Sequence, residues 1–328
     1  MENGGRKRLR PVGVVLFDIL MVGVVLVVFS LFHHVLPKIE EPIELIVDIE
    51  ANPTARPSKT AALPALQAMA TAVPVPTYAP GDFTAAFPTE DTGVDATYSY
   101  QSDSLRIAVH KVQENGITYF AADVWIRDIS LFKTAFAGGQ YGKGQREAPL
   151  NIARENNAIL AATGDYYGAR SSGVVIRNGE LFREKPYGDV CVLYFDGTME
   201  TFTKNEFDID SAIEKKAWQA WSFGPELLKD GLPVEEFGGS ISGKNPRCGI
   251  GYYEPGHYLL VVADGRQQGY SSGMTLAEFS SLFYTLGCKV AYNLDGGATA
   301  QMMFEDERIN LPSDGGRKSS DIIFFGVG

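Results

Sequence analysis

An apolar segment near the amino terminus limits most strongly what this chain can fold into. Residues Val12–Leu36 are apolar almost without interruption, and Asp18 is the one charged residue among them. About 20 apolar residues span the core of a bilayer, so the segment is long enough to cross one. Residues 1–10 carry four basic side chains and one acidic side chain. This order predicts a cytoplasmic tail over residues 1–10 and a transmembrane anchor over residues 11–36, with the rest of the chain exported.

A cleaved signal peptide is the main alternative to an uncleaved anchor. It has the same order of charge and apolar residues, but Leu36-Pro37-Lys38 offers no small-residue cleavage site. A buried core helix would rarely be apolar on every side over such a length. We therefore expect a single-pass protein of the cell membrane, with a cytoplasmic amino terminus and an extracytoplasmic carboxy-terminal domain.

Prolines are concentrated after the apolar segment. Nine of the 17 prolines lie between Pro37 and Pro88, in a stretch that is also rich in alanine and threonine. Proline lacks the backbone donor and favours extended conformers. Residues 37–97 are therefore expected to form a semi-stiff linker with little core of its own.

Short apolar strands separated by glycine turns begin at about residue 98. Two pairs of expected strands are each joined by an Asn-Gly turn, which is a strong hairpin signal. They are Leu105–Val112 with Ile117–Ile126, and Val174–Arg177 with Glu180–Phe182. Further strands are expected at Val190–Phe195, Thr198–Phe202, His257–Ala263 and Asp321–Phe325.

Two helices are expected among these strands. Thr275 and Glu278 have the spacing of a capping box, and apolar residues then recur at helical spacing as far as Gly287. A shorter helix is expected from about Pro149 to Asn156. The pattern predicts one α+β domain over residues 98–328, a strand-rich mixed sheet with a few packed helices.

Composition argues against several kinds of function. The 29 basic and 40 acidic residues give a net charge of −11, which argues against nucleic acid as a partner. The three cysteines, Cys191, Cys248 and Cys288, are too few and too widely spaced for a disulfide scaffold or a zinc knuckle.

Four segments place carboxylates, arginines and glycines at the ends of expected strands. They are Ala158–Gly168, Asn245–Gly251, Lys289–Thr299 and Asn310–Arg317. In the third segment an apolar strand ends at Asp295 and two glycines follow. Small residues there would let a ligand approach backbone N–H groups, which can bind an oxyanion. The alternative is a tight turn in which Asp295 only accepts backbone hydrogen bonds.

Taken in order, the four segments resemble the motifs of the phosphodiester glycosidase family. Asn293–Thr299 (NLDGGAT) is similar to N-L-D-G-G-G-S, Thr163–Tyr167 (TGDYY) to N-G-D-Y-F, and Arg247–Gly251 (RCGIG) to R-x-A-I-G. Arg317 resembles the arginine that precedes the last strand of the family. The family includes N-acetylglucosamine-1-phosphodiester alpha-N-acetylglucosaminidase-like enzymes and exopolysaccharide-associated bacterial proteins. The resemblance covers roughly residues 100–328.

The resemblance implies hydrolysis of the bond between sugar C1 and a phosphodiester oxygen. Such a reaction needs a carboxylate at the oxocarbenium-like carbon, and arginine suits the phosphate because its planar fork binds two oxygens. The resemblance implies Asp165 and Asp295 as the two catalytic carboxylates, with the acid and the nucleophile or base not distinguished. The residues that it implies for phosphate and substrate binding are Arg247, Arg317, Gly296, Gly297, Thr299, Arg266 and Tyr166. For Tyr166, packing within the turn is the alternative to stacking on the sugar.

Three residues depart from the family pattern. Thr163, Ala298 and Thr299 stand where asparagine, glycine and serine are usual. Ala298 adds a methyl group where the backbone would approach the ligand. These changes affect the expected substrate more than the expected fold.

The expected partner is a glycan or sugar-phosphate substrate of the cell envelope, together with the membrane through the amino-terminal helix. No ligand spacing requires a cofactor, although the oxygen ligands of Asp165 and Asp295 would suit a divalent cation. Two alternative functions are a non-catalytic saccharide-binding or scaffolding module of the same fold, and a phosphodiesterase that attacks phosphorus. Because the chain is acidic, a site for anionic substrates requires the arginines to converge in one pocket.

Overall fold

The computed structural model describes residues 38–39, 81–89, 95–239 and 241–326. The expected cytoplasmic tail, the expected anchor and most of the expected linker lie outside these residues. Within the described ranges, no helix combines the length and the apolar character needed to cross a membrane.

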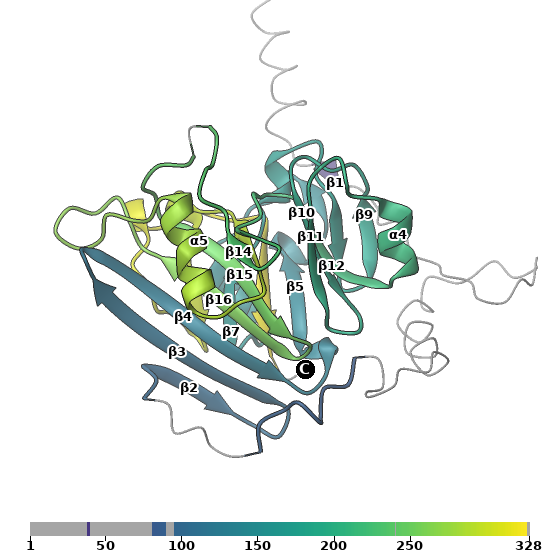
Figure 1. The fold of residues 1–328 in the computed structure, drawn as a ribbon, viewed down its shortest axis with the longest axis horizontal. Helices are drawn as coiled ribbons and strands as arrows, with labels where there is room; N and C mark the ends of the chain where they lie inside the picture. Colours follow the sequence, from purple (N-terminus) through teal and green to yellow (C-terminus); the bar gives the residue numbers. More distant parts are fainter. Residues whose placement is uncertain (1–37, 40–80, 90–94, 240, 327–328) are drawn as a thin grey trace, which may run out of the picture. The chain divides into compact units, whose positions relative to one another are not determined.

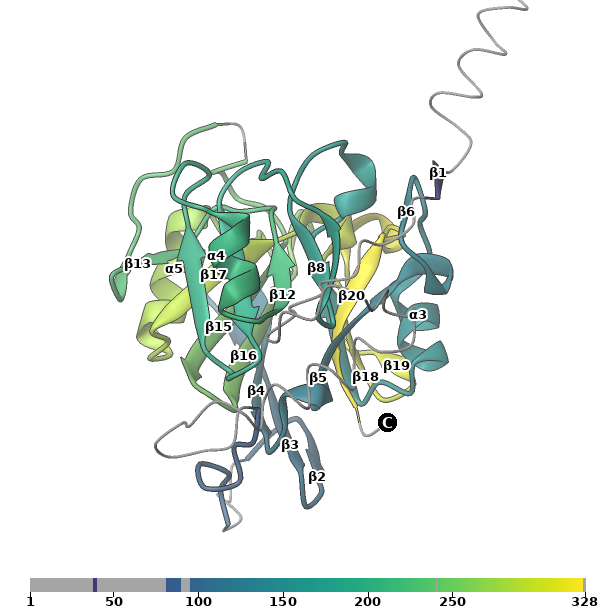
Figure 2. The ribbon, with the colours of Figure 1, turned by 90° about the vertical axis from the view of Figure 1, so that its right-hand side faces the viewer.

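Three large sheets make up most of the described body (Figures 1 and 2). The order of the first is β17 (Val290–Leu294), β15 (Arg247–Glu254), β16 (His257–Ala263), β4 (Ile117–Ile126), β3 (Leu105–Glu114) and β2 (Tyr98–Gln101). The order of the second is β11 (Met199–Phe202), β10 (Val190–Tyr194), β12 (Ala217–Trp221), β8 (Val175–Arg177) and β9 (Glu180–Arg183). The order of the third is β19 (Glu307–Arg308), β18 (Met302–Phe304), β7 (Leu160–Thr163), β20 (Asp321–Phe325) and β5 (Phe132–Phe136).

The remaining elements are short. The small strands are β1 (Lys38–Ile39), β6 (Gly142–Lys143), β13 (Leu228–Lys229) and β14 (Leu232–Pro233). The α-helices are α3 (Pro149–Glu155), α4 (Ile209–Glu214) and α5 (Leu276–Thr285). Single 3₁₀ turns are η2 (Ile129–Leu131), η3 (Ala137–Gly139), η4 (Tyr167–Ala169), η5 (Gly297–Thr299) and η6 (Ser313–Gly315).

The strand-rich α+β class is confirmed, but the expected mixed sheet is wrong. Every strand pairing within the three large sheets is antiparallel. Tight turns can join only antiparallel neighbours, whereas a parallel pair needs a long crossover. The Asn-Gly hairpins are confirmed as β3–β4 and β8–β9. Helix α4 has no counterpart among the expected helices.

The three sheets share one core. The largest buried cluster includes Ile250 of β15, Leu193 of β10 and Phe325 of β20, so each sheet contributes to it. Burial of large apolar side chains contributes about 1.5–3 kcal/mol each. This common core fixes the strand ends of one sheet relative to those of the next. The three cysteines are also buried, and none forms a disulfide.

Helix α5 covers the outer side of the first sheet, across β15 and β16 in Figure 1. The expected capping box is present, because the Thr275 hydroxyl accepts from the Glu278 N–H and the Glu278 carboxylate accepts from the Thr275 N–H. The helix lies very close to β15, where a Cβ on Gly249 would be 2.8 Å from the Phe279 ring. Glycine in β15 therefore allows the close approach that seals this side of the sheet. Helix α3, which is also confirmed, packs beside β20 and β7 (Figure 2).

Candidate active site

The antiparallel register of the first sheet brings several candidate residues to one edge. Cys248 of β15 pairs with Leu294 of β17, which sets Arg247 opposite Asp295 at the next position. On its other side Arg247 pairs with the last residue of β16, and Arg266 follows three residues later. Backbone pairing thus places one carboxylate and two guanidinium groups at a single sheet edge.

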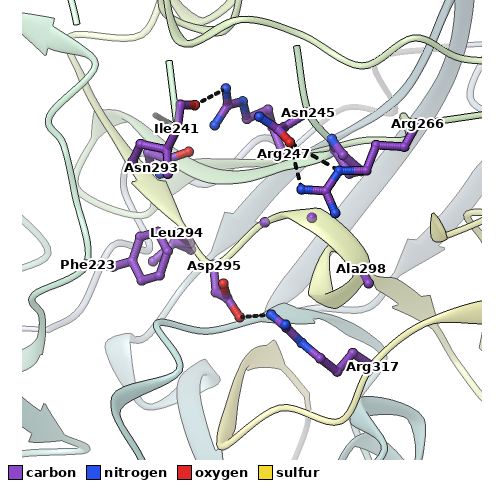
Figure 3. Close-up of a pocket in the computed structure, with 13 residues that line it drawn as sticks. Phe223, Ile241, Asn245, Arg247, Arg266, Asn293, Leu294, Asp295, Ala298 and Arg317 are labelled. Carbon is purple, nitrogen blue, oxygen red and sulfur yellow. Dashed lines mark hydrogen bonds and ion pairs between the residues drawn. The ribbon is translucent and has the colours of Figure 1, made fainter. Parts of the chain in front are cut away.

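A cavity of about 230 Å³ lies at this edge (Figure 3). Its described lining consists of Phe223, Ile241, Asn245, Pro246, Arg247, Arg266, Asn293, Leu294, Asp295, Gly296, Gly297, Ala298 and Arg317. Three arginines and a single acidic side chain are among these residues. The predicted convergence of arginines is therefore observed, in a chain with a net charge of −11.

Asp295 is the carboxylate in this cavity. Its side chain is only 8% exposed, and the nearest guanidinium nitrogen, Nη2 of Arg317, is 3.8 Å from Oδ2. Within the part of the chain that the structure describes, this Oδ2 atom has no hydrogen-bond partner. Burial raises the pKa of Asp295 to about 6, although hydrogen bonding by Thr299 and the charge of Arg317 act in the opposite direction. The Asp295 carboxyl group therefore changes protonation near pH 6.

Arg317 is held beside Asp295 by the hydroxyl of Thr299. Nε and Nη2 of Arg317 donate to Thr299 Oγ1 over 3.0 and 2.6 Å. Thr299 is fully buried and does not line the cavity. The Arg317 guanidinium also lies over the ring of Tyr166, 5.2 Å from the ring centroid. Tyr166 is likewise absent from the cavity lining, so both residues orient Arg317 instead of facing the cavity.

Arg266 reaches the cavity from a strained turn. Its φ of 59° lies in the left-handed region, and its Nε and Nη2 donate to Asn245 Oδ1 over 3.1 and 2.7 Å. Among the described residues it forms no ion pair with a carboxylate. Gly297 has a φ of 64°, and a Cβ there would be 3.3 Å from Nη1 of Arg266. The glycine therefore leaves space for this guanidinium over the backbone.

Arg247 is the most buried of the three arginines, at 4% exposure. Its Nε donates to the Met274 carbonyl over 2.9 Å and its Nη2 to the Ile241 carbonyl over 2.7 Å. Burial, followed by the neighbouring charge of Arg266, lowers the pKa of Arg247 to about 10. The side chain thus stays cationic at neutral pH and also fixes the loop that borders the cavity.

Asp165, the expected second catalytic carboxylate, does not line the cavity. Its Oδ1 is 2.9 Å from Nη2 of Arg177 and accepts from the Tyr167 N–H, while its Oδ2 accepts from the Ser222 N–H. Arg177 also forms a 2.9 Å ion pair with Asp321. Both oxygens of Asp165 are therefore engaged in a buried network. The charge of Asp165 still contributes to the raised pKa of Asp295.

The sequence assigned no individual role to several cavity residues, among them Asn293 and Phe223. Asn293 is a polar residue in the otherwise apolar strand β17. A polar residue at a buried strand position is a sequence signal for a site residue. Phe223 follows β12 in an irregular segment, and nothing in the local pattern marks it. Among the described residues, no group of three His, Cys, Asp or Glu side chains is arranged to hold a metal ion.

Comparison with known proteins assigns the chain to a family. The phosphodiester glycosidase family model matches residues 156–326. The Bacillus subtilis (strain 168) SPbeta prophage-derived uncharacterized protein YomE is 33% identical over 187 residues, which cover 53% of this chain. The match covers only 29% of the length of YomE.

Solved structures show the same fold. The zebrafish N-acetylglucosamine-1-phosphodiester alpha-N-acetylglucosaminidase catalytic domain is 19% identical, with a TM-score of 0.54 over 71% of this chain and 86% of that domain. A hypothetical protein from Synechocystis is 13% identical, with a TM-score of 0.54 over 70% of this chain and 64% of the other. The region matched by the family model contains every described residue that lines the cavity. The chain therefore belongs to the phosphodiester glycosidase family, and the matched region runs from β7 to β20.

Proposed function

We propose that this chain hydrolyses sugar-1-phosphodiesters and breaks the bond between sugar C1 and the phosphate oxygen. The observation that carries the proposal is the buried Asp295 carboxylate, one oxygen of which accepts no hydrogen bond from the described residues, in a cavity lined by three arginines. A carboxylate is the group that glycoside cleavage requires at the anomeric carbon. Guanidinium groups bind an anionic phosphate through charge-assisted hydrogen bonds.

In this proposal the phosphate lies against Arg266 and Arg317. The leaving group is a phosphate monoester, which needs compensation of its charge more than it needs a proton. Preorganised donors in a site shielded from water stabilise such developing charge strongly. Arg247 adds a third positive charge from its buried position.

Asp295 acts at the anomeric carbon in its ionised form, either by forming a bond to C1 or by stabilising the oxocarbenium-like transition state. Water supplies the oxygen that ends on C1, and the bridging oxygen leaves with the phosphate. We assign Asp165 a positioning role, because its two oxygens hold Arg177 and the N–H groups of Tyr167 and Ser222. This differs from the second catalytic carboxylate expected from the sequence.

The proposed substrate and location follow from the family and from the sequence. The zebrafish enzyme in the comparison is named for N-acetylglucosamine-1-phosphodiesters, which makes N-acetylhexosamine phosphodiesters the first substrates to examine. The apolar segment over residues 11–36 supports an anchored, extracytoplasmic enzyme that acts on envelope glycans. A divalent cation remains compatible with the proposal and is not required by it.

Release of free sugar tests the proposal. The purified full-length chain is incubated with UDP-N-acetylglucosamine and with simpler N-acetylglucosamine-1-phosphodiesters, with and without added Mg²⁺ or Ca²⁺. We expect free sugar and a phosphate monoester to appear in equal amounts. Binding without release of sugar would instead support the non-catalytic saccharide-binding alternative.

The pH dependence of the reaction should follow Asp295. Because the raised pKa of about 6 belongs to a group that acts when ionised, kcat/KM should rise tenfold per pH unit below 6 and level off above it. Steady-state rates between pH 4.5 and 8.5 measure this profile. A rate that falls as the pH rises through 6 would indicate that Asp295 acts as an acid.

Arg266 and Arg317 should contribute to the rate of hydrolysis by binding the phosphate of the substrate. We expect Arg266→Ala and Arg317→Ala each to lower kcat/KM by roughly 10²-fold, which is the usual effect of removing one transition-state donor. Arg146→Ala is the matched control, since Arg146 also stacks on Tyr166, at 5.1 Å, but does not line the cavity. Losses of equal size in all three variants would contradict a specific role for Arg266 and Arg317.

A further inference from the structure

Asn293 carries a buried acceptor that the fold leaves unused. The residue is 2% exposed, and its Nδ2 donates to the Gly224 carbonyl over 2.8 Å. This bond fixes the orientation of the amide, so Oδ1 is the end that remains. In the described part of the chain, Oδ1 has no hydrogen-bond partner, and Asn293 lines the same cavity as Asp295.

The cavity has two chemically different sides around Asp295. In Figure 3, Asn293 and Phe223 lie to one side of the carboxylate, and Arg266 and Arg317 lie to the other. Asn293 and Asp295 are two positions apart on an extended chain, so they share a face with a spacing of roughly 7 Å. The side of Arg266 and Arg317 thus offers two exposed guanidinium groups, and the other side offers the uncharged Asn293 acceptor beside the Phe223 ring.

The two sides of the cavity match the two halves of a sugar-1-phosphodiester, its sugar and its phosphate. An unpaired buried acceptor is costly unless a ligand or a water supplies a donor. The bridging phosphodiester has only acceptor oxygens, so it cannot serve Asn293, whereas a sugar hydroxyl or amide N–H can. The Phe223 ring, on which the Arg170 guanidinium packs at 4.5 Å from the centroid, supplies an apolar wall for the C–H face of a sugar.

We propose that Asn293 Oδ1 accepts a hydrogen bond from a hydroxyl or amide group of the sugar, and that this contact selects the sugar to be cleaved. The inference rests on the proposed function and deepens it, since it places the sugar on the Asn293 side and the phosphate on the arginine side. Sites that pair a buried polar group with a substrate donor discriminate strongly against analogues that lack the donor.

A donor scan on the unmodified protein tests this assignment. N-acetylglucosamine-1-phosphodiester analogues are prepared with each hydroxyl replaced in turn by hydrogen or by fluorine, and with the acetamido group replaced by an ester. At one position we expect kcat/KM to fall by about 10- to 100-fold. Hydrogen and fluorine should be equally damaging there, because neither donates. Equal rates across all analogues would overturn the assignment and would indicate that only water meets Oδ1.

Two variants locate the effect at Asn293. Asn293→Ala should lower kcat/KM on the parent substrate to the value on the sensitive analogue, with no further loss on that analogue. Asn245→Ala is the matched control, since Asn245 also lines the cavity but holds Arg266. It should reduce the rates on parent and analogue by the same factor. Discrimination that survives in Asn293→Ala would overturn the assignment.

Calorimetric binding separates this inference from the proposed function. The Asp295→Asn protein retains Asn293, so its affinities for the same analogues should show the same sensitive position even if turnover is undetectable. Affinities that are uniform across the analogues would overturn the role of Asn293 alone. Failure to bind any sugar-1-phosphodiester would overturn the proposed function as well.

Discussion

Asp295→Asn is expected to lower kcat for sugar-1-phosphodiester hydrolysis on the order of 10³-fold or more, while the protein stays folded. The amide is nearly the same size as the carboxylate but can neither attack C1 nor neutralise a cationic transition state. Losses of this size are usual when a reacting group is removed. Release of free sugar by the variant and the parent protein, measured side by side, checks the expectation. Retention of activity within tenfold would show that another group performs the chemistry.

The same substitution should stabilise the fold above pH 6. The pKa of Asp295 in the folded protein, about 6, exceeds its usual value of 3.8. Its ionisation therefore costs stability as the pH rises through 6, whereas below about pH 4 the group is neutral in both states. At pH 8 the asparagine variant should gain about 3 kcal/mol, and at pH 4 it should gain almost nothing. Thermal melts at the two pH values measure this difference.

A surface substitution provides the control for these melts. Asp103 is exposed, so Asp103→Asn should change neither the melting temperature nor the rate of hydrolysis by a measurable amount. If Asp295→Asn gave the same stability gain at both pH values, burial of an ionised carboxylate would not be the cause of the gain.

Arg177→Met is expected to destabilise the protein by about 3–5 kcal/mol at pH 7. Arg177 is buried in β8 and is the cation that balances both Asp165 and Asp321. Without it, two buried carboxylates would lie together uncompensated. Burial and the nearby charge of Asp165 already raise the pKa of Asp321. The free energy of unfolding from urea titration measures the loss.

Two comparisons test the cause of that loss. Arg154→Met removes an exposed arginine 3.9 Å from Asp306, and exposed pairs contribute at most about 1 kcal/mol. The destabilisation by Arg177→Met should also shrink toward pH 4, where the carboxylates can take up protons. A loss for Arg177→Met no larger than that for Arg154→Met would contradict a structural role for the buried network.

Local chemistry explains what the sequence could predict. The turns at Asn115-Gly116 and Asn178-Gly179 and the capping box at Thr275 depend on residues a few positions apart, so they can be recognised without knowing the fold. The glycine-rich segments also end strands as expected. Their convergence around Asp295 follows from antiparallel register, which alternating apolar patterns constrain.

The remaining features depend on contacts between sheets. Arg177 and Asp321 are 144 positions apart and belong to different sheets, so no local pattern pairs them. That pairing engages Asp165 and keeps it out of the cavity lining. The arrangement of the strands in three antiparallel sheets instead of one mixed sheet likewise depends on which buried faces meet. Asn293 belongs to the NLDGGAT motif, but only the fold shows that its Oδ1 atom has no hydrogen-bond partner among the described residues.

Hydrolysis by the full-length chain in ¹⁸O-water tests the central claim most directly. If Asp295 directs cleavage at the anomeric carbon, mass spectrometry should find the label in the C1 hydroxyl of the released sugar and none in the phosphate monoester. The Asp295→Asn protein should release no labelled sugar above background. Label in the phosphate would mean attack at phosphorus and would contradict the account.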